Sequence, residues 1–140
     1  MSSSVELRIP GWPALQEAAR SGRLAHAYLI VGSPRREGLQ TALRMLQLVF
    51  CAEPGRACGT CRGCRLVERR AHVDVHWLEP ESRSRRITIG DPASPEADPG
   101  VRYGLIEPLS RSAMEGGWKA AVVLAADRLT LPAANALLKT

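Results

Sequence analysis

The sequence is poor in aromatic residues, has no cysteine outside one short stretch, and contains no long apolar run. No segment approaches the roughly 20 apolar residues that a membrane-spanning helix needs, so we expect no membrane partner. The aromatic residues are three Trp, two Tyr and one Phe, too few to suggest a stacking platform for single-stranded nucleic acid. The chain also opens without an apolar leader. These absences argue against secretion and favour a reducing, cytoplasmic compartment.

The length and charge of the chain set wide limits on its function. With 140 residues, 45% of them hydrophobic, the chain is long enough for one soluble domain with a hydrophobic core. Its net charge of +5 permits contact with a polyanion without requiring it. Two groups of arginines occur, Arg62, Arg65, Arg69 and Arg70 in the first and Arg83, Arg85 and Arg86 in the second. Each group is equally compatible with a solvated surface and with a polyanion contact.

The four cysteines form the strongest motif in the sequence. Cys51, Cys58, Cys61 and Cys64 follow the spacing C-x6-C-x2-C-x2-C. Short loops of this kind can aim four thiolates at one ion, and four cysteines in closed tetrahedral geometry are typical of structural Zn²⁺. Gly55, Gly59 and Gly63 lie between the ligands and are expected to supply tight or left-handed turns. We therefore predict a zinc module at about residues 51–64 that folds its loop and catalyses nothing.

Three other interpretations of the four cysteines fit less well. Two disulfides would require an oxidising compartment. An iron–sulfur cluster of the ferredoxin type usually ends in C-x3-C-P, whereas here the last step is C-x2-C followed by Arg65. A redox-active CxxC pair would need only two of the four thiols. A structural metal explains all four residues together.

The apolar pattern changes repeatedly between helical and strand periods. Helices are expected from Trp12 to Ser21, from Leu39 to Phe50, over about residues 62–70, and after Thr130, which can cap a last helix. Buried strands are expected at Ala27–Val31, Val73–Leu78 and Lys119–Leu124. Alternating strands and helices predict an α/β fold with a parallel sheet flanked by helices.

Two segments interrupt this alternation, and the two ends of the chain are also irregular. Residues 79–100 are polar and proline-rich, which predicts a flexible loop. A helix over Val101–Leu109 should be kinked or shortened by Pro108. The opening residues 1–10 are expected to form an irregular arm, and the last helix stops at Thr140 in the middle of its pattern. We expect the chain to be cut short at this end.

The first predicted strand is followed by the remains of a phosphate-binding loop. A working loop reads G-x-x-x-x-G-K-S/T, with a lysine for the terminal phosphates and a hydroxyl for Mg²⁺. Counted from Gly32, this sequence has Glu37, Gly38 and Leu39 at the positions of the second glycine, the lysine and the hydroxyl. A carboxylate at this point repels phosphate. We therefore expect no ATP or other cofactor to bind in this loop.

The second half of an ATPase site is also missing from the sequence. An ATPase of this type carries acidic residues directly after the strand that contains Val122 and Val123, to hold Mg²⁺ and orient water. Leu124 and Ala125 occupy those positions here, and Asp127 follows two residues later. Asp127 is better explained as a loop or cap residue. We predict no catalytic residue in this chain.

With these segments established, the chain resembles the AAA+ clamp-loader subunits of bacterial DNA polymerase III. The resemblance is strongest to the delta-prime family, because the related tau/gamma motor subunits share the cysteine module but keep a working phosphate loop. It covers most of the chain in the expected order. The matching segments are Arg23–Leu29, the loop at Gly32, Cys58–Cys64, His72–His76 and, most specifically, Leu129–Thr140.

The resemblance implies an AAA+ (P-loop NTPase-like) fold and a non-enzymatic stator in a bacterial clamp loader. In this family the subunit docks on the tau/gamma and delta subunits, and the ATP-driven ring places the sliding clamp on primer-template DNA during replication. Such a complex works in the cytoplasm, near the nucleoid. The family's lid domain, collar domain and arginine finger would lie beyond this chain. The alternatives are an ATP-binding motor subunit of the tau/gamma type with an atypical loop, and an independent zinc-finger protein that binds nucleic acid. The latter is disfavoured because the sequence has no ββα recognition pattern.

Overall fold

The computed structural model describes residues 8–80, 86–115 and 117–139. The chain divides into two compact units, Met1–His72 and Val73–Thr140, and each is described by itself. The opening arm predicted over residues 1–10 lies mostly outside the described residues, as do Arg83, Arg85 and Thr140. Within the described parts of the chain, no helix is both long enough and apolar enough to cross a membrane.

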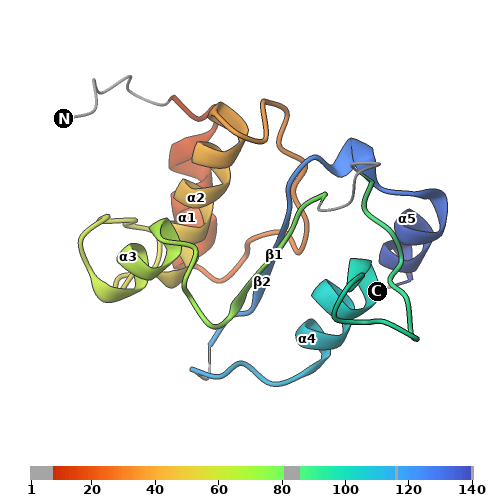
Figure 1. Cartoon of the computed structure of the whole chain (residues 1–140). Coiled ribbons are helices and arrows are strands. Elements are labelled where there is room, and N and C mark those ends of the chain that lie inside the picture. The colour runs from red at the N-terminus through yellow and green to blue at the C-terminus, as the bar shows by residue number, and fades with distance from the viewer. Residues whose placement is uncertain (1–7, 81–85, 116, 140) are drawn as a thin grey trace. The chain divides into compact units, whose positions relative to one another are not determined.

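The first unit contains three helices, α1 (Trp12–Arg20), α2 (Glu37–Phe50) and α3 (Arg62–Glu68) (Figure 1). All three were predicted, the first two from their apolar spacing, and are confirmed. Gly11 precedes α1 in a left-handed conformation with φ 72°, and Cys61 caps α3. Helix α2 buries more residues than the other two helices, namely Gly38, Ala42, Leu43, Leu46, Gln47 and Leu48.

The strand predicted at Ala27–Val31 is wrong. These residues form no strand, and Leu29 and Val31 are 85% and 92% exposed. The side chain of Tyr28 instead accepts a hydrogen bond from the backbone N–H of Ala25 at 2.9 Å. A strand exists only where a second backbone pairs with it, and the described residues of the first unit contain no strand. Strand-forming residue types were therefore insufficient to predict this segment.

The second unit contains a parallel two-stranded sheet made of β1 (Val75–Leu78) and β2 (Ala120–Val123). The register pairs Val75 with Ala120 and Leu78 with Val123, and Figure 1 shows the two strands side by side. Both strands and their parallel direction were predicted and are confirmed. Parallel strands need a long crossover connection, and residues 79–119 form it here.

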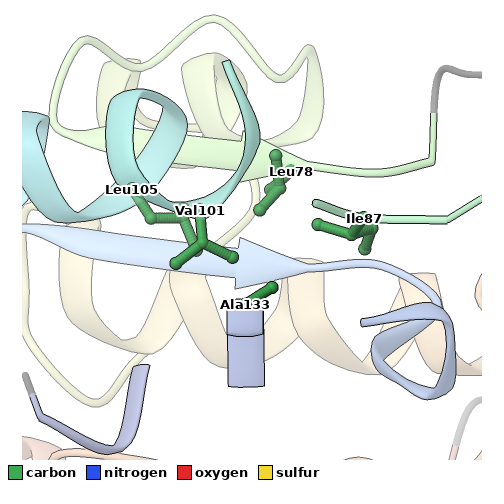
Figure 2. Packing of buried hydrophobic residues seen from close by; sticks show 5 residues of the cluster. All are labelled: Leu78, Ile87, Val101, Leu105 and Ala133. Atoms are coloured by element: carbon green, nitrogen blue, oxygen red, sulfur yellow. The ribbon is translucent and has the colours of Figure 1, made fainter. Parts of the chain in front are cut away.

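The core of the second unit lies around this crossover. It consists of Leu78, Ile87, Val101, Leu105 and Ala133, all at most 7% exposed, and Figure 2 shows these side chains together. Ile87 is fixed there by backbone hydrogen bonds of 2.9 Å to Arg128 and Thr130. Helix α5 (Leu131–Leu138) then begins at Thr130, whose hydroxyl accepts a hydrogen bond from the Ala133 N–H at 3.4 Å. The predicted Thr130 cap is confirmed.

Pro108 changes the helix that precedes β2. The expected helix is present but divided into η1 (Arg102–Ile106), a π-helical turn, and α4 (Glu107–Ser110). Pro108 has no N–H to donate and its ring crowds the carbonyl of Gly104, four residues earlier. The wider turn before the proline is one way for a helix to accommodate this loss.

The proline-rich segment 79–100 is closed by its own hydrogen bonds over the part that the structure describes. The Thr88 hydroxyl donates to the Asp98 carboxylate at 2.6 Å, and the Asp91 N–H donates to the Asp98 carbonyl at 2.9 Å. The Val101 N–H donates to the Thr88 carbonyl at 2.9 Å, which closes the part of the segment from residue 88 to residue 101. The mobility of this loop stays a prediction.

Candidate metal centre

The four predicted cysteine ligands are brought together in the first unit. Their Sγ atoms all lie within 4.8 Å of one another. Cys51 follows the last residue of α2, Cys61 precedes α3, Cys64 lies in its first turn, and Cys58 lies in the loop between. The Cys51 and Cys61 sulfurs are 3.9 Å apart. Tetrahedral bonds of about 2.3 Å give sulfur–sulfur edges of about 3.8 Å, so the cluster has the dimensions of a site for one metal ion.

Backbone N–H groups point at the sulfurs of this cluster. The N–H groups of Cys61 and Cys64 donate to the sulfurs of Cys58 and Cys61 at 3.3 and 3.4 Å, and that of Ala52 donates to Cys61 at 3.4 Å. Hydrogen bonds from the backbone of Thr60 and Cys61 lower the pKa of Cys58 to about 5. Those from Cys64 and Ala52 lower the pKa of Cys61. Both residues are therefore prepared to act as thiolates, the form that binds metal.

Cys64 is the buried member of the cluster. Its side chain is 0% exposed, and Cys51 is 6% exposed. Burial raises the pKa of Cys64 to about 12, because a thiolate loses its hydration there. Without a cation this thiol keeps its proton near neutral pH. A bound metal ion would replace that proton, so metal binding and burial of this ligand are linked.

Two residues that support the cluster were not identified from the sequence. Gln47, 4% exposed on α2, donates to the Cys64 carbonyl at 3.2 Å. Arg44 donates to the Gln47 side chain at 2.6 Å and to the Ala57 carbonyl at 3.0 Å. The ring of His72 lies 4.3 Å from that of Phe50, measured between centroids. A polar residue on the apolar face of the predicted α2 helix was the one available signal for Gln47.

The glycines between the ligands have two different roles. Gly55 and Gly59 have φ values of 85° and 79°, which confirms the predicted left-handed turns. Gly63 has no left-handed φ and lies inside α3. Its importance comes from close approach, because a Cβ atom at this position would overlap the carbonyl oxygen of Phe50 at the end of α2. The turn predicted for Gly63 is therefore wrong, although a glycine is required.

In the loop from Gly32 to Leu39, the Glu37 carboxylate accepts a hydrogen bond from the loop's own backbone. The Ser33 N–H donates to Oε1 of Glu37 at 3.0 Å, and the Gly38 N–H donates to the Ser33 carbonyl at 2.9 Å. The first contact lowers the pKa of Glu37. Gly38 is buried, and a Cβ atom at this position would lie 2.6 Å from the Ser33 carbonyl oxygen. The loop conformation thus excludes a lysine at the position where a phosphate loop carries one.

Replacing Glu37 by glutamine should lower the melting temperature of the chain near neutral pH and have less effect in acid. The ionised carboxylate is the form that the Ser33 N–H stabilises. Its stabilising contribution is present above the unfolded-state pKa of about 4.3 and is lost as pH falls through the lower folded-state value. Melting curves of Glu37→Gln and wild type at both pH values test this. Glu53→Gln, at a carboxylate paired with Arg56 at 3.3 Å, is the control, and a pH-independent difference for Glu37→Gln contradicts the prediction.

The residues after β2 do not form an acidic pair. Leu124 is 8% exposed and apolar, and Ala125 has a φ of 57°. Asp127 lies in a short 3-10 turn, η2 (Ala126–Arg128), with 81% of its side chain exposed and 3.9 Å from Arg128. The loop position predicted for Asp127 is confirmed.

Comparison with known proteins identifies the family. The family described as "DNA polymerase III, delta subunit" matches residues 11–140. The chain belongs to this family. The matched span of the delta-subunit family contains both the cysteine cluster and the Gly32 loop, and the predicted resemblance is confirmed.

Three curated relatives carry the name "DNA polymerase III subunit delta'". The chain is 32% identical to the Bacillus subtilis protein, and this match covers 89% of the chain. It is 34% identical to the Escherichia coli protein over 94% of the chain. It is 31% identical to the Pseudomonas aeruginosa protein over 83%. It spans only 35%, 37% and 33% of these relatives.

Proposed function

We propose that this chain is the AAA+-like N-terminal domain of a non-catalytic stator subunit in a bacterial replicative clamp loader. Its partners would be the tau/gamma and delta subunits, and through the complex the sliding clamp and primer-template DNA. The proposal is supported by the family match over residues 11–140 and by relatives named as delta' subunits of DNA polymerase III. The small α/β unit with a parallel sheet is compatible with an AAA+ fold.

The contact between Glu37 and Ser33 is the observation that carries the non-catalytic assignment. Phosphate loops bind nucleotide through free backbone N–H groups and a lysine. Here the Ser33 N–H is taken by a carboxylate 3.0 Å away, and the lysine position is a buried glycine without room for a side chain. A phosphate would have to displace a like charge. The loop therefore holds an internal anion in the place of a nucleotide.

The absence of acidic residues directly after β2 supports the same assignment. Hydrolysis requires charge stabilisation by Mg²⁺ and a group that orients the attacking water. The described residues after β2 offer Leu124, Ala125 and an outward-lying Asp127. A subunit that lacks both the phosphate loop and the acidic residues of an ATPase site is suited to hold neighbouring subunits in place, and not to drive the ATPase cycle.

We propose zinc as the ion of the four-cysteine cluster, with a structural role. Four sulfur donors, an edge of 3.9 Å and a closed, partly buried setting fit tetrahedral Zn²⁺ with no open position for a substrate. Cys51, Cys58, Cys61 and Cys64 would hold the ion. Bound zinc would tie the end of α2 to the start of α3.

Calorimetric titration of Mg-ATP into the zinc-loaded, folded chain tests the non-catalytic assignment. We expect no binding heat up to millimolar nucleotide, because Glu37 occupies the loop. Circular dichroism of the same sample establishes that the chain is folded. Micromolar binding would contradict the stator proposal and favour a motor subunit of the tau/gamma type.

A further inference from the structure

The net positive charge of the chain lies in its first unit. Residues 1–72 contain eleven arginines and five glutamates, with neither lysine nor aspartate, whereas residues 73–140 contain eight basic and nine acidic residues. The two parts thus carry net charges of +6 and −1, which together give the +5 of the chain. Composition of this kind is a known footprint of polyanion binding.

Helix α3 presents part of this charge on one side. Arg62, Arg65 and Arg69 are exposed and follow the i, i+3, i+7 spacing of a single helix face, here named the arginine face. The opposite side holds Cys64 and Val67, which are 0% and 1% exposed. The rise of an α-helix places the outer two arginines about 10 Å apart. The cysteine cluster fixes this helix, so the arginine face is held in a defined orientation on its unit.

The arginines of this face differ from others in the same unit. Within the described residues, neither Arg65 nor Arg69 takes part in a salt bridge, whereas Arg20 and Arg56 pair with Glu17 and Glu53 at 3.8 and 3.3 Å. Charges already in ion pairs contribute less to an outside ligand. Arg65 and Arg69 are therefore the cations of α3 that are best placed to meet one.

The chemistry of the face favours phosphate over bases. A guanidinium binds phosphate oxygens with two parallel hydrogen bonds. Base recognition by stacking would need open aromatic rings. The Phe50 ring packs on His72, and Trp12 lies beneath the Arg44 guanidinium at 5.2 Å, while the exposed Tyr28 lies outside α3. The face thus suits a regular array of phosphates and presents no aromatic ring on which a base could stack.

We propose that the arginine face of α3 binds the phosphate backbone of duplex DNA without sequence preference. The inference rests on the proposed function, which brings the chain to primer-template DNA, and adds a direct DNA contact by the cysteine module. Arg65 and Arg69 would each neutralise one phosphate. Each such contact contributes a slope of about −0.9 to a plot of log Kobs against log salt concentration.

Fluorescence anisotropy with a labelled duplex of mixed sequence, at several potassium chloride concentrations, tests this with the folded, zinc-loaded 140-residue chain. We expect Arg65→Gln/Arg69→Gln to bind about tenfold more weakly at low salt and to reduce the slope by about 1.8. Arg20→Gln/Arg56→Gln removes the same charge from the same unit at ion-paired positions and should change either quantity much less. Circular dichroism checks that each variant is folded. Arg69 follows the last residue of α3, and the single variant Arg69→Gln should change the slope by about 0.9.

Three results would overturn the proposal. Equal weakening by the two double variants would mean that net charge alone attracts DNA. No binding to the duplex at low salt would remove the contact altogether. Displacement of the duplex by polyglutamate at matched charge would assign the face to an acidic polypeptide. Assembly with the partner subunits, measured in the absence of DNA, tests the stator function separately, so the two proposals can fail independently.

Discussion

Cys64→Ser is expected to abolish stable metal binding and to unfold the cysteine module. The Cys64 sulfur is one of four that lie within 4.8 Å of one another, and the Cys64 side chain is fully buried. A serine hydroxyl is a poor substitute for a thiolate, and even indirect partners of metal ligands change affinity about 10–100-fold. We expect zinc affinity to fall by more than about a hundredfold. Because the binding energy of a structural zinc is also folding energy, the thermal transition of the first unit should be lost or broadened.

Two comparisons separate loss of the metal from loss of packing. Cys58→Ser removes a half-exposed ligand, so it should release the metal without leaving a polar group in a buried site. Adding a chelator to the wild type should reproduce the Cys58→Ser melting curve and leave that of Cys64→Ser unchanged. Native mass spectrometry counts the bound ions, with one zinc expected per wild-type chain. A wild-type melting curve that a chelator does not alter would contradict the metal assignment, and loss of structure on reduction alone would indicate disulfides.

The cysteine cluster was predictable because its geometry is almost entirely local. Its ligands fall between Cys51 and Cys64, so a few turns are enough to bring them together. The support from Gln47 and Arg44 depends instead on how α2 lies against the loop and α3. That packing is set by contacts between residues distant in sequence, and apolar spacing does not reveal it.

The Gly32 loop illustrates the same limit within eight residues. The sequence revealed that the lysine and hydroxyl were missing, and that Glu37 brought a repulsive charge. It did not reveal that Glu37 would turn back and accept the Ser33 N–H at 3.0 Å. This contact adds to the interpretation of the loop, because a phosphate would have to compete with the Glu37 carboxylate for the Ser33 N–H.

The strands show where the strand preference of residue types is sufficient to predict the structure. Val75–Leu78 and Ala120–Val123 pair with each other inside one unit, so local propensity and available partners agree. Ala27–Val31 has the same residue types but no strand partner among the described residues of its unit. Strand propensity measures how well a residue packs against a neighbouring strand more than an intrinsic backbone preference. The sequence of one segment alone does not show whether a neighbouring strand is available.

Gly63→Ala is expected to destabilise the cysteine module more strongly than Gly59→Ala, another substitution between the ligands. The added Cβ would overlap the Phe50 carbonyl oxygen, and this contact is with backbone, which cannot rotate away. Overpacking of a tight contact costs about 1–3 kcal/mol, and here relief requires α3 to move away from α2. Because α2 leads into Cys51 and α3 contains Cys64, that movement also separates two ligands. We expect zinc affinity and melting temperature to fall together, the latter by on the order of 10 °C.

The neighbouring glycines provide matched controls for this prediction. A Cβ at Gly59 meets open space, but its φ of 79° makes alanine unfavourable by about 1–2 kcal/mol. Gly117, in the second unit, has open space and no left-handed φ, so Gly117→Ala should be close to neutral. The expected order of melting temperatures is therefore Gly117→Ala, then Gly59→Ala, then Gly63→Ala as the lowest. Zinc titration against a competing chelator should show the largest loss of affinity for Gly63→Ala. Equal effects at Gly59 and Gly63 would mean that backbone conformation, and not the approach of α3 to α2, makes glycine necessary here.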